Sequence, residues 1–416
     1  MPPSIRCRLL LCSLGLLSVS MMAKATDELR FSGFATIGVA SNDDEQLEFR
    51  RDITQENGSR DGQWRLDIDS LLGLQWNLKL NEQWDATAQL VLRDRAKQSL
   101  GESLEWAFLR YRWRDGSDLR IGRLGLDIYM LSDYRYVGYA YPWVRPVPDF
   151  YGIVPLFHFD GIDYSHRFDF DTGSLWLKVF AGRSDSYFPT DDDEFKLTVE
   201  PGWGFTLLYE QEPWRVRLSS TRVELNSELP NEELHVALAA AAPLWPHALD
   251  ISEQLRLKGA KVDYDAIGFT YDNNRWLVQS EFAHINGNRP TTPSSRSAYL
   301  SVGHRIGAFT PFLIVSGAEP DDPPSRPSLP PLPPPFAAML EPLRAASELA
   351  LNNTRLEQRG VGVGLRWDFL PQKSLKLQWD RWQVDADGRV LWRYDLSEPL
   401  ADRTVNVFSL SVDMLL

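Results

Sequence analysis

Cysteine is almost absent from this chain of 416 residues. Its two cysteines, Cys7 and Cys12, lie close to the N-terminus, so disulfides cannot stabilise the remainder. No apolar run after residue 25 is long enough for a transmembrane helix, which needs about 20 residues. Basic residues are also scarce: 44 Lys and Arg stand against 57 Asp and Glu, giving a formal charge of −13. This acidic balance argues against nucleic acid as a partner.

The N-terminal segment has the pattern of a secretory signal peptide. Two arginines precede an apolar run at residues 9–22, and an Ala-Lys-Ala cleavage site follows. We therefore predict a signal peptide at residues 1–25. The remaining residues, 26–416, contain no boundary that would divide them, and we expect them to form one unit.

Large apolar residues alternate with polar ones through most of this unit. The clearest stretch runs from Trp64 to Leu80, where leucines occupy one face and charged or amide side chains the other. The last residues repeat the pattern, with a large apolar side chain at every second position from Phe408 to Leu416. Alternation with a period of two predicts strands that have one apolar face.

The alternation predicts sixteen strands with connections of two kinds. We expect the strands near residues 29–40, 62–80, 84–97, 104–114, 117–124, 158–170, 173–184, 202–211, 213–226, 260–272, 275–286, 296–306, 308–318, 357–370, 373–385 and 404–416. Long connections are expected at 41–61, 98–103, 125–157, 185–201, 227–259, 287–295, 319–356 and 386–403, and the others are short turns. An even number of strands, with short turns at one end and long loops at the other, predicts an all-β fold: a 16-stranded antiparallel transmembrane barrel with short periplasmic turns and long extracellular loops. Tryptophans near the short turns, such as Trp84 and Trp214, are typical of a membrane-interface girdle.

Two of the long loops have a distinctive composition. Residues 320–335 are rich in proline, which favours a stiff polyproline II segment within the extracellular loop 319–356. Alanine and leucine dominate Phe336 to Leu351, where we expect a short helix. A second helix is expected within residues 233–251.

Residues 120–164 carry the most specific pattern. Gly122 and Arg123 end a strand, a long loop rich in Tyr, Trp and Pro follows at 125–157, and Phe159 opens the next strand. Together with the signal peptide, the sixteen strands and the terminal strand, this segment resembles the general trimeric porins of Gram-negative outer membranes. The resemblance implies that 125–157 folds into the barrel as a constriction loop. A lid on the surface, or a contact between subunits, is the alternative.

Strand parity and the resemblance together indicate candidate site residues. By parity, six arginines point into the lumen: Arg65, Arg93, Arg95, Arg110, Arg112 and Arg120. The resemblance implies that carboxylates of the inward loop face them, with Asp133 the best match and Asp127 and Asp149 further candidates. Opposed charges of this kind create a transverse field that selects ions. Alternatively, the arginines pair with carboxylates of their own wall and simply fill the lumen.

No pattern for catalysis or metal binding stands out. The six histidines (His158, His166, His235, His247, His284 and His304) lack the spacing of a metal site, and no His-Ser pair near a carboxylate stands out. We expect neither an enzyme nor a cofactor.

The expected function is passive diffusion of small hydrophilic solutes or ions across the outer membrane through a water-filled pore. The expected partners are membrane lipid and lipopolysaccharide, and the resemblance implies a homotrimer. Two alternatives remain: a substrate-specific channel for an organic acid or sugar, and a non-conducting structural or adhesion barrel.

Overall fold

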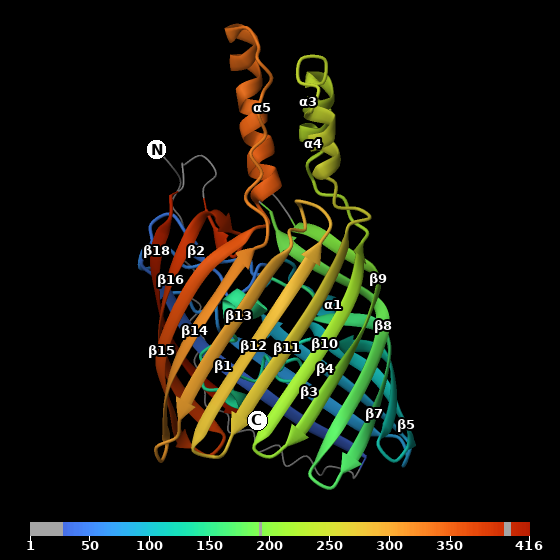
Figure 1. Ribbon diagram of the computed structural model, residues 1–416. Helices are drawn as coiled ribbons and strands as arrows, with labels where there is room; N and C mark the ends of the chain where they lie inside the picture. Colours follow the sequence, from blue (N-terminus) through green and yellow to red (C-terminus); the bar gives the residue numbers. More distant parts are fainter. Residues whose placement is uncertain (1–27, 191–193, 395–400) are drawn as a thin grey trace, which may run out of the picture.

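Sixteen antiparallel strands close into a single barrel in the computed structural model, which describes residues 28–190, 194–394 and 401–416 (Figure 1). The first strand, β1, closes on the last, β18, with Phe34 opposite Leu415 and Asn42 opposite Val407. Closure leaves no strand edge unpaired, as the bilayer interior requires. The predicted fold is confirmed. The barrel strands are β1 (Leu29–Asn42), β3 (Leu71–Lys79), β4 (Trp84–Arg93), β5 (Leu104–Arg114), β6 (Ser117–Gly125), β7 (His158–Phe170), β8 (Gly173–Pro189), β9 (Glu194–Gln211), β10 (Trp214–Leu225), β11 (Lys261–Asp272), β12 (Trp276–Gly287), β13 (Ser295–His304), β14 (Phe309–Pro320), β15 (Leu356–Leu370), β16 (Lys373–Arg389) and β18 (Arg403–Leu415).

Two predicted boundaries differ from the structure. The strand expected at 62–80 begins only at Leu71, because the amide of Ser70 bonds the carbonyl of Leu66 and closes a turn. Ile68 and Asp69 are both buried although they are neighbours, so the alternation breaks there. The long loop expected at 185–201 is mostly strand, since β8 and β9 pair as far as Pro189 and Glu194.

The outer surface of the barrel is apolar at the level of the bilayer. Exposed large side chains occur all around it, among them Ile37, Ile121, Ile162, Val179, Leu218, Ile267, Phe282, Leu300, Leu313, Val361, Leu377 and Leu410. Nearer the short turns, exposed aromatic side chains form the predicted girdle: Trp84, Trp113, Phe170, Trp214, Trp276, Phe309 and Trp367. A closed barrel with such a belt is a membrane-spanning structure.

The long loops carry helices that stand out from the end of the barrel (Figure 1). They are α3 (Glu232–Ala241), α4 (Ala248–Gln254) and α5 (Pro334–Asn352), close to where helices were expected. Trp245 and Leu255 of the first loop and Leu340 of the second belong to one apolar cluster. Within the described residues, no helix is both long and apolar enough to cross a bilayer.

Other loops turn inward instead. Loop 43–70 pairs with the loop after β16 through the small sheet of β2 (Glu48–Phe49) and β17 (Trp392–Arg393). Loop 126–157, with the short helices η1 (Gly138–Ala140) and α2 (Pro148–Tyr151), contacts β1, β13, β14, β15 and β18. The largest apolar core therefore lies within the barrel, between loop and wall.

Candidate functional site: the barrel lumen and its inner loop

Segment 126–157, here called the inner loop, crosses the lumen. It is almost wholly buried although it has little regular structure. Trp143, 1% exposed, donates a 2.7 Å hydrogen bond from its indole to Ser301 of β13 and stacks on Tyr141. Burying a side chain of this size contributes about 1.5–3 kcal/mol. The aromatic composition that distinguishes this segment in the sequence thus forms a core inside the barrel.

The start of the inner loop is attached through Asp127. Its carboxylate forms ion pairs with Lys178 of β8 and Arg217 of β10, while its carbonyl accepts a hydrogen bond from Thr206 of β9. Burial alone would raise the pKa of Asp127, but the charges of Arg217 and Lys178 outweigh it and hold the pKa well below the usual range. Asp127 is therefore ionised at neutral pH and anchors the loop to three strands.

The middle of the loop is held on the opposite side by buried cations. Arg145 bonds Asp69 through two nitrogens at 2.7 and 2.6 Å, and its guanidinium lies 3.5 Å from Asp380 of β16. Lys376 of β16, which is completely buried, donates to the carbonyl oxygens of Gly138 and Trp143 at 2.6 Å each. A buried cation is stable only with such partners, so these contacts fix the loop against the wall.

Asp149 attaches the end of the loop without a cation. Its carboxylate accepts hydrogen bonds from Ser316, Gln358 and Trp382, at 2.7, 2.7 and 3.1 Å. Burial raises the pKa of Asp149, and the three donors only partly offset that effect. Gly360 lies beside this contact: a Cβ there would be 2.5 Å from the indole nitrogen of Trp382.

A second carboxylate, Glu281 of β12, receives the loop nearby. It accepts the backbone N–H of Met130 at 2.8 Å and the hydroxyl groups of Tyr151 and Tyr299. The inner loop is thus bonded to strands on both sides of the lumen.

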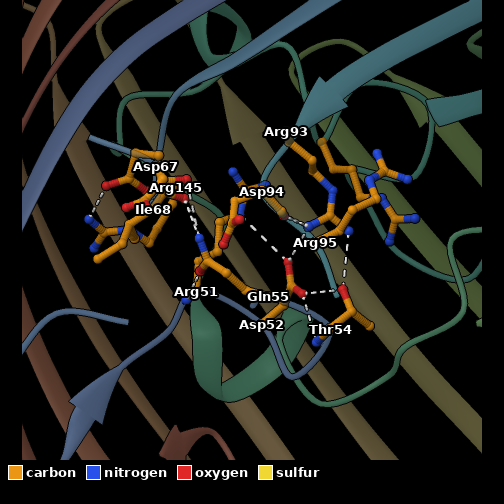
Figure 2. A network of polar contacts seen from close by, with 12 residues as sticks. Arg51, Asp52, Thr54, Gln55, Asp67, Ile68, Arg93, Asp94, Arg95 and Arg145 are labelled. Atoms are coloured by element: carbon orange, nitrogen blue, oxygen red, sulfur yellow. Dashed lines mark hydrogen bonds and ion pairs between the residues drawn. The ribbon is translucent and has the colours of Figure 1, made fainter. Parts of the chain in front are cut away.

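Two of the predicted arginines, Arg93 and Arg95, have buried partners outside the inner loop. Figure 2 shows Arg93 next to Asp52 and Thr54 of loop 43–70, with an Arg93–Asp52 ion pair of 3.2 Å. Arg95 pairs with Glu105 of β5 at 3.2 Å. Both side chains are buried, so they stabilise the structure and do not line an accessible pore wall.

The other four arginines also pair with carboxylates outside the inner loop. Arg65 lies before β3 and bonds Asp67, while Arg110 and Arg112 share Asp85. Arg120 pairs with Asp163 at 2.5 Å. In the described part of the chain, none of the six forms an ion pair with Asp127, Asp133 or Asp149.

Arg120 is the predicted arginine whose charge interacts with predicted carboxylates of the inner loop. Asp133 is exposed, and it and Asp127 lie close enough to Arg120 to interact with its charge. Arg110 and Arg112 keep about a third or more of their side chains accessible. This arginine-lined side lies on β5 and β6, and its polar side chains remain partly accessible. The selection of ions by these residues stays a prediction.

Sequence reasoning named Asp127 and Asp149, although for another role, but it did not find the other residues that anchor the inner loop. These are Asp69, Arg145, Lys178, Arg217, Glu281 and Lys376. Inward parity gives a signal for four of them, Lys178, Arg217, Glu281 and Lys376, because each lies on the polar face of its strand. For metal ions, no group of three or more His, Cys, Asp or Glu side chains is suitably placed among the described residues.

Comparison with known proteins gives matches by structure alone. No protein-family model and no curated protein sequence matches this chain. The anion-selective porin of Comamonas acidovorans is similar with a TM-score of 0.53 and 11% identity, covering 94% of this chain and 100% of that one. The outer-membrane channel DcaP of Acinetobacter baumannii is similar with a TM-score of 0.51 and 9% identity, covering 94% of this chain and 99% of that one. Salmonella typhi OmpF is similar with a TM-score of 0.50 and 11% identity, covering 93% of this chain and 97% of that one. With its closed barrel and apolar belt, this chain has the fold of the outer-membrane porins.

Proposed function

We propose that this barrel is a passive outer-membrane channel whose inner loop restricts the lumen to selected small solutes. The observation that carries the proposal is the anchoring of the inner loop to opposite walls by Asp127, Arg145 and Asp149. A loop attached only at its ends would have left the lumen wide. The porin fold supports a channel, and the packed lumen favours a selective one over a wide general pore.

Charges of both signs line the accessible side on β5 and β6. Arg110, Arg112 and Arg120 are partly accessible there, and they share their surface with three carboxylates, Asp85, Asp118 and Asp163. Cations along a narrow water-filled path lower the barrier for anions and raise it for cations. The substrate-specific alternative, a channel for an organic acid, fits the guanidinium donors of this side, since they can bind a carboxylate.

Passive diffusion of small hydrophilic ions is the second candidate. The accessible arginine-lined side supports it, since water that reaches Arg110 and Arg112 offers a route for small ions. The two candidates differ in whether one class of solute competes with the ions.

Planar-bilayer recording tests the proposal. We expect small, resolved conductance steps, and a reduction of these steps by organic acids if the channel is selective. Steps that organic acids leave unchanged would favour simple diffusion of ions. Correctly folded barrels that never conduct would refute both candidates and favour a structural or adhesion role.

A further inference from the structure

An apolar cavity of about 420 Å³ lies on the long-loop side of the inner loop. Leu126, Ile128 and Leu156 of the inner loop contribute to its lining. Its wall includes Phe188 at the loop end of β8 and Phe195 at the start of β9. A solute that enters from the loops would therefore meet this cavity before it reaches the inner loop.

The lining is unusual for a water-filled vestibule. Most of its side chains are Leu, Ile, Val, Phe and Pro, and the polar ones other than Arg50 are neutral hydroxyl or amide groups. Water in such a space finds few hydrogen-bond partners, whereas an apolar molecule gains by leaving water. A volume of this size is within the range of sites for small organic ligands.

Arg50 is the one charged residue of this lining in the described part of the chain. It is 7% exposed, and its Nε and Nη2 donate to the carbonyl oxygens of Leu391 and Val390 at 3.4 and 3.1 Å. Its Nη1 has no hydrogen-bond partner, and its guanidinium has no ion pair, among the described residues. Burial lowers the pKa of Arg50 to about 10, with Arg393 acting in the same direction. The carboxylates of Asp52, Glu48 and Glu56 act in the opposite direction, but none of them forms an ion pair with Arg50 among the described residues. The group remains a cation at neutral pH, without an anion from the described residues in direct contact.

We propose that this cavity binds small monocarboxylic acids with an apolar body, the carboxylate on Arg50 and the body against the apolar wall. This assignment rests on the proposed channel function and names its substrate class. A guanidinium binds a carboxylate through charge-assisted hydrogen bonds, and an acid places an anion in direct contact with Arg50 without adding a second charge to the apolar wall. Sugars do not fit, because the lining offers too few groups for their hydroxyls.

Binding of a homologous series in lipid nanodiscs tests the assignment. Butyrate, hexanoate and octanoate are titrated into the full barrel by calorimetry, with empty nanodiscs as the blank for partition into lipid. We expect affinity to rise by about fourfold for each added methylene, since burying one contributes about 0.8 kcal/mol. Equal affinity for butyrate and octanoate would overturn the apolar site.

Substitutions separate the roles of charge and cavity. Arg50→Met should weaken octanoate binding by about tenfold to a hundredfold, the equivalent of a lost charge-assisted hydrogen bond, and leave the affinity for neutral octanamide unchanged. Arg359→Met removes an exposed arginine of β15 as the matched control and should change neither. Unchanged octanoate binding in Arg50→Met would overturn the carboxylate assignment. If that variant fails to fold, Val223→Trp, which fills part of the cavity, should abolish octanoate binding, and retained binding would refute the site.

The binding assay requires no transport, so its outcome is separable from that of the proposed function. A barrel that binds octanoate but never conducts would refute the channel and leave the site standing. A conducting barrel that binds none of the acids would refute the site alone.

Discussion

Replacing Arg145 by methionine should release the inner loop. The Arg145 side chain is 1% exposed, as is that of its partner Asp69, and Asp380 lies 3.5 Å away. Methionine removes the cation and leaves two buried carboxylates without it. Breaking a buried pair in this way costs about 3–5 kcal/mol, which shifts the equilibrium between docked and undocked loop by about a hundredfold to several thousandfold.

Single-channel recording in planar bilayers measures this release. We expect larger and noisier conductance steps in Arg145→Met than in the native barrel, because the loop no longer stays across the lumen. A matched variant with all three charges removed, Arg145→Met with Asp69→Asn and Asp380→Asn, should recover most of the native conductance. An unchanged step size in Arg145→Met, in a barrel that folds normally, would refute the view that this ion pair holds the loop.

Three further predictions address other contacts of the lumen. Asp127 has a lowered pKa, so its contribution to docking is present above the usual aspartate pKa of about 3.9 and is lost only as pH falls through the lower folded value. The conductance of the native barrel should therefore stay constant from pH 7 down to about 4, and Asp127→Asn should raise the conductance at pH 7. The reasoning would be contradicted if the native barrel opened near pH 5 and the Asp127→Asn variant did not show that transition. Gly360→Ala should displace the indole that bonds Asp149 and lower stability by about 1–3 kcal/mol in thermal unfolding, whereas Gly317→Ala on the next strand, where the nearest atom would be 3.4 Å away, should not. Arg110→Glu combined with Arg112→Glu should shift the reversal potential toward cations, and an unchanged potential would show that these side chains lie off the ion path.

The barrel could be predicted from the sequence because each strand is specified by the alternation of its own neighbouring residues. Alternation assigns each strand a face, and the sixteen strands occur close to the expected positions. The predicted strand boundaries are wrong where the side chains do not alternate between apolar and polar. Ile68 and Asp69 turn inward together before β3, and the strand ends of β8 and β9 extend into polar sequence that reads as loop.

The contacts of the inner loop depend on residues far apart in the chain. The backbone N–H of Val144 bonds Gln378, 234 positions away, and Asp149 bonds Trp382 across a similar interval. Parity shows that a side chain points inward but not which loop reaches it. Arg93 illustrates this limit, because it points inward as expected and yet pairs with Asp52 of a different loop.

Thiol accessibility in the folded barrel tests the central claim, that residues 126–157 fill the lumen. Both native cysteines lie in the first 12 residues, within the predicted signal peptide, so a single introduced cysteine in the mature chain is a clean probe. Val144 is 3% exposed and Ala140 is exposed in the same segment. We predict that Val144→Cys in the purified, folded barrel resists a hydrophilic maleimide while Ala140→Cys reacts. Rapid and equal labelling at both positions would contradict a packed loop inside the barrel.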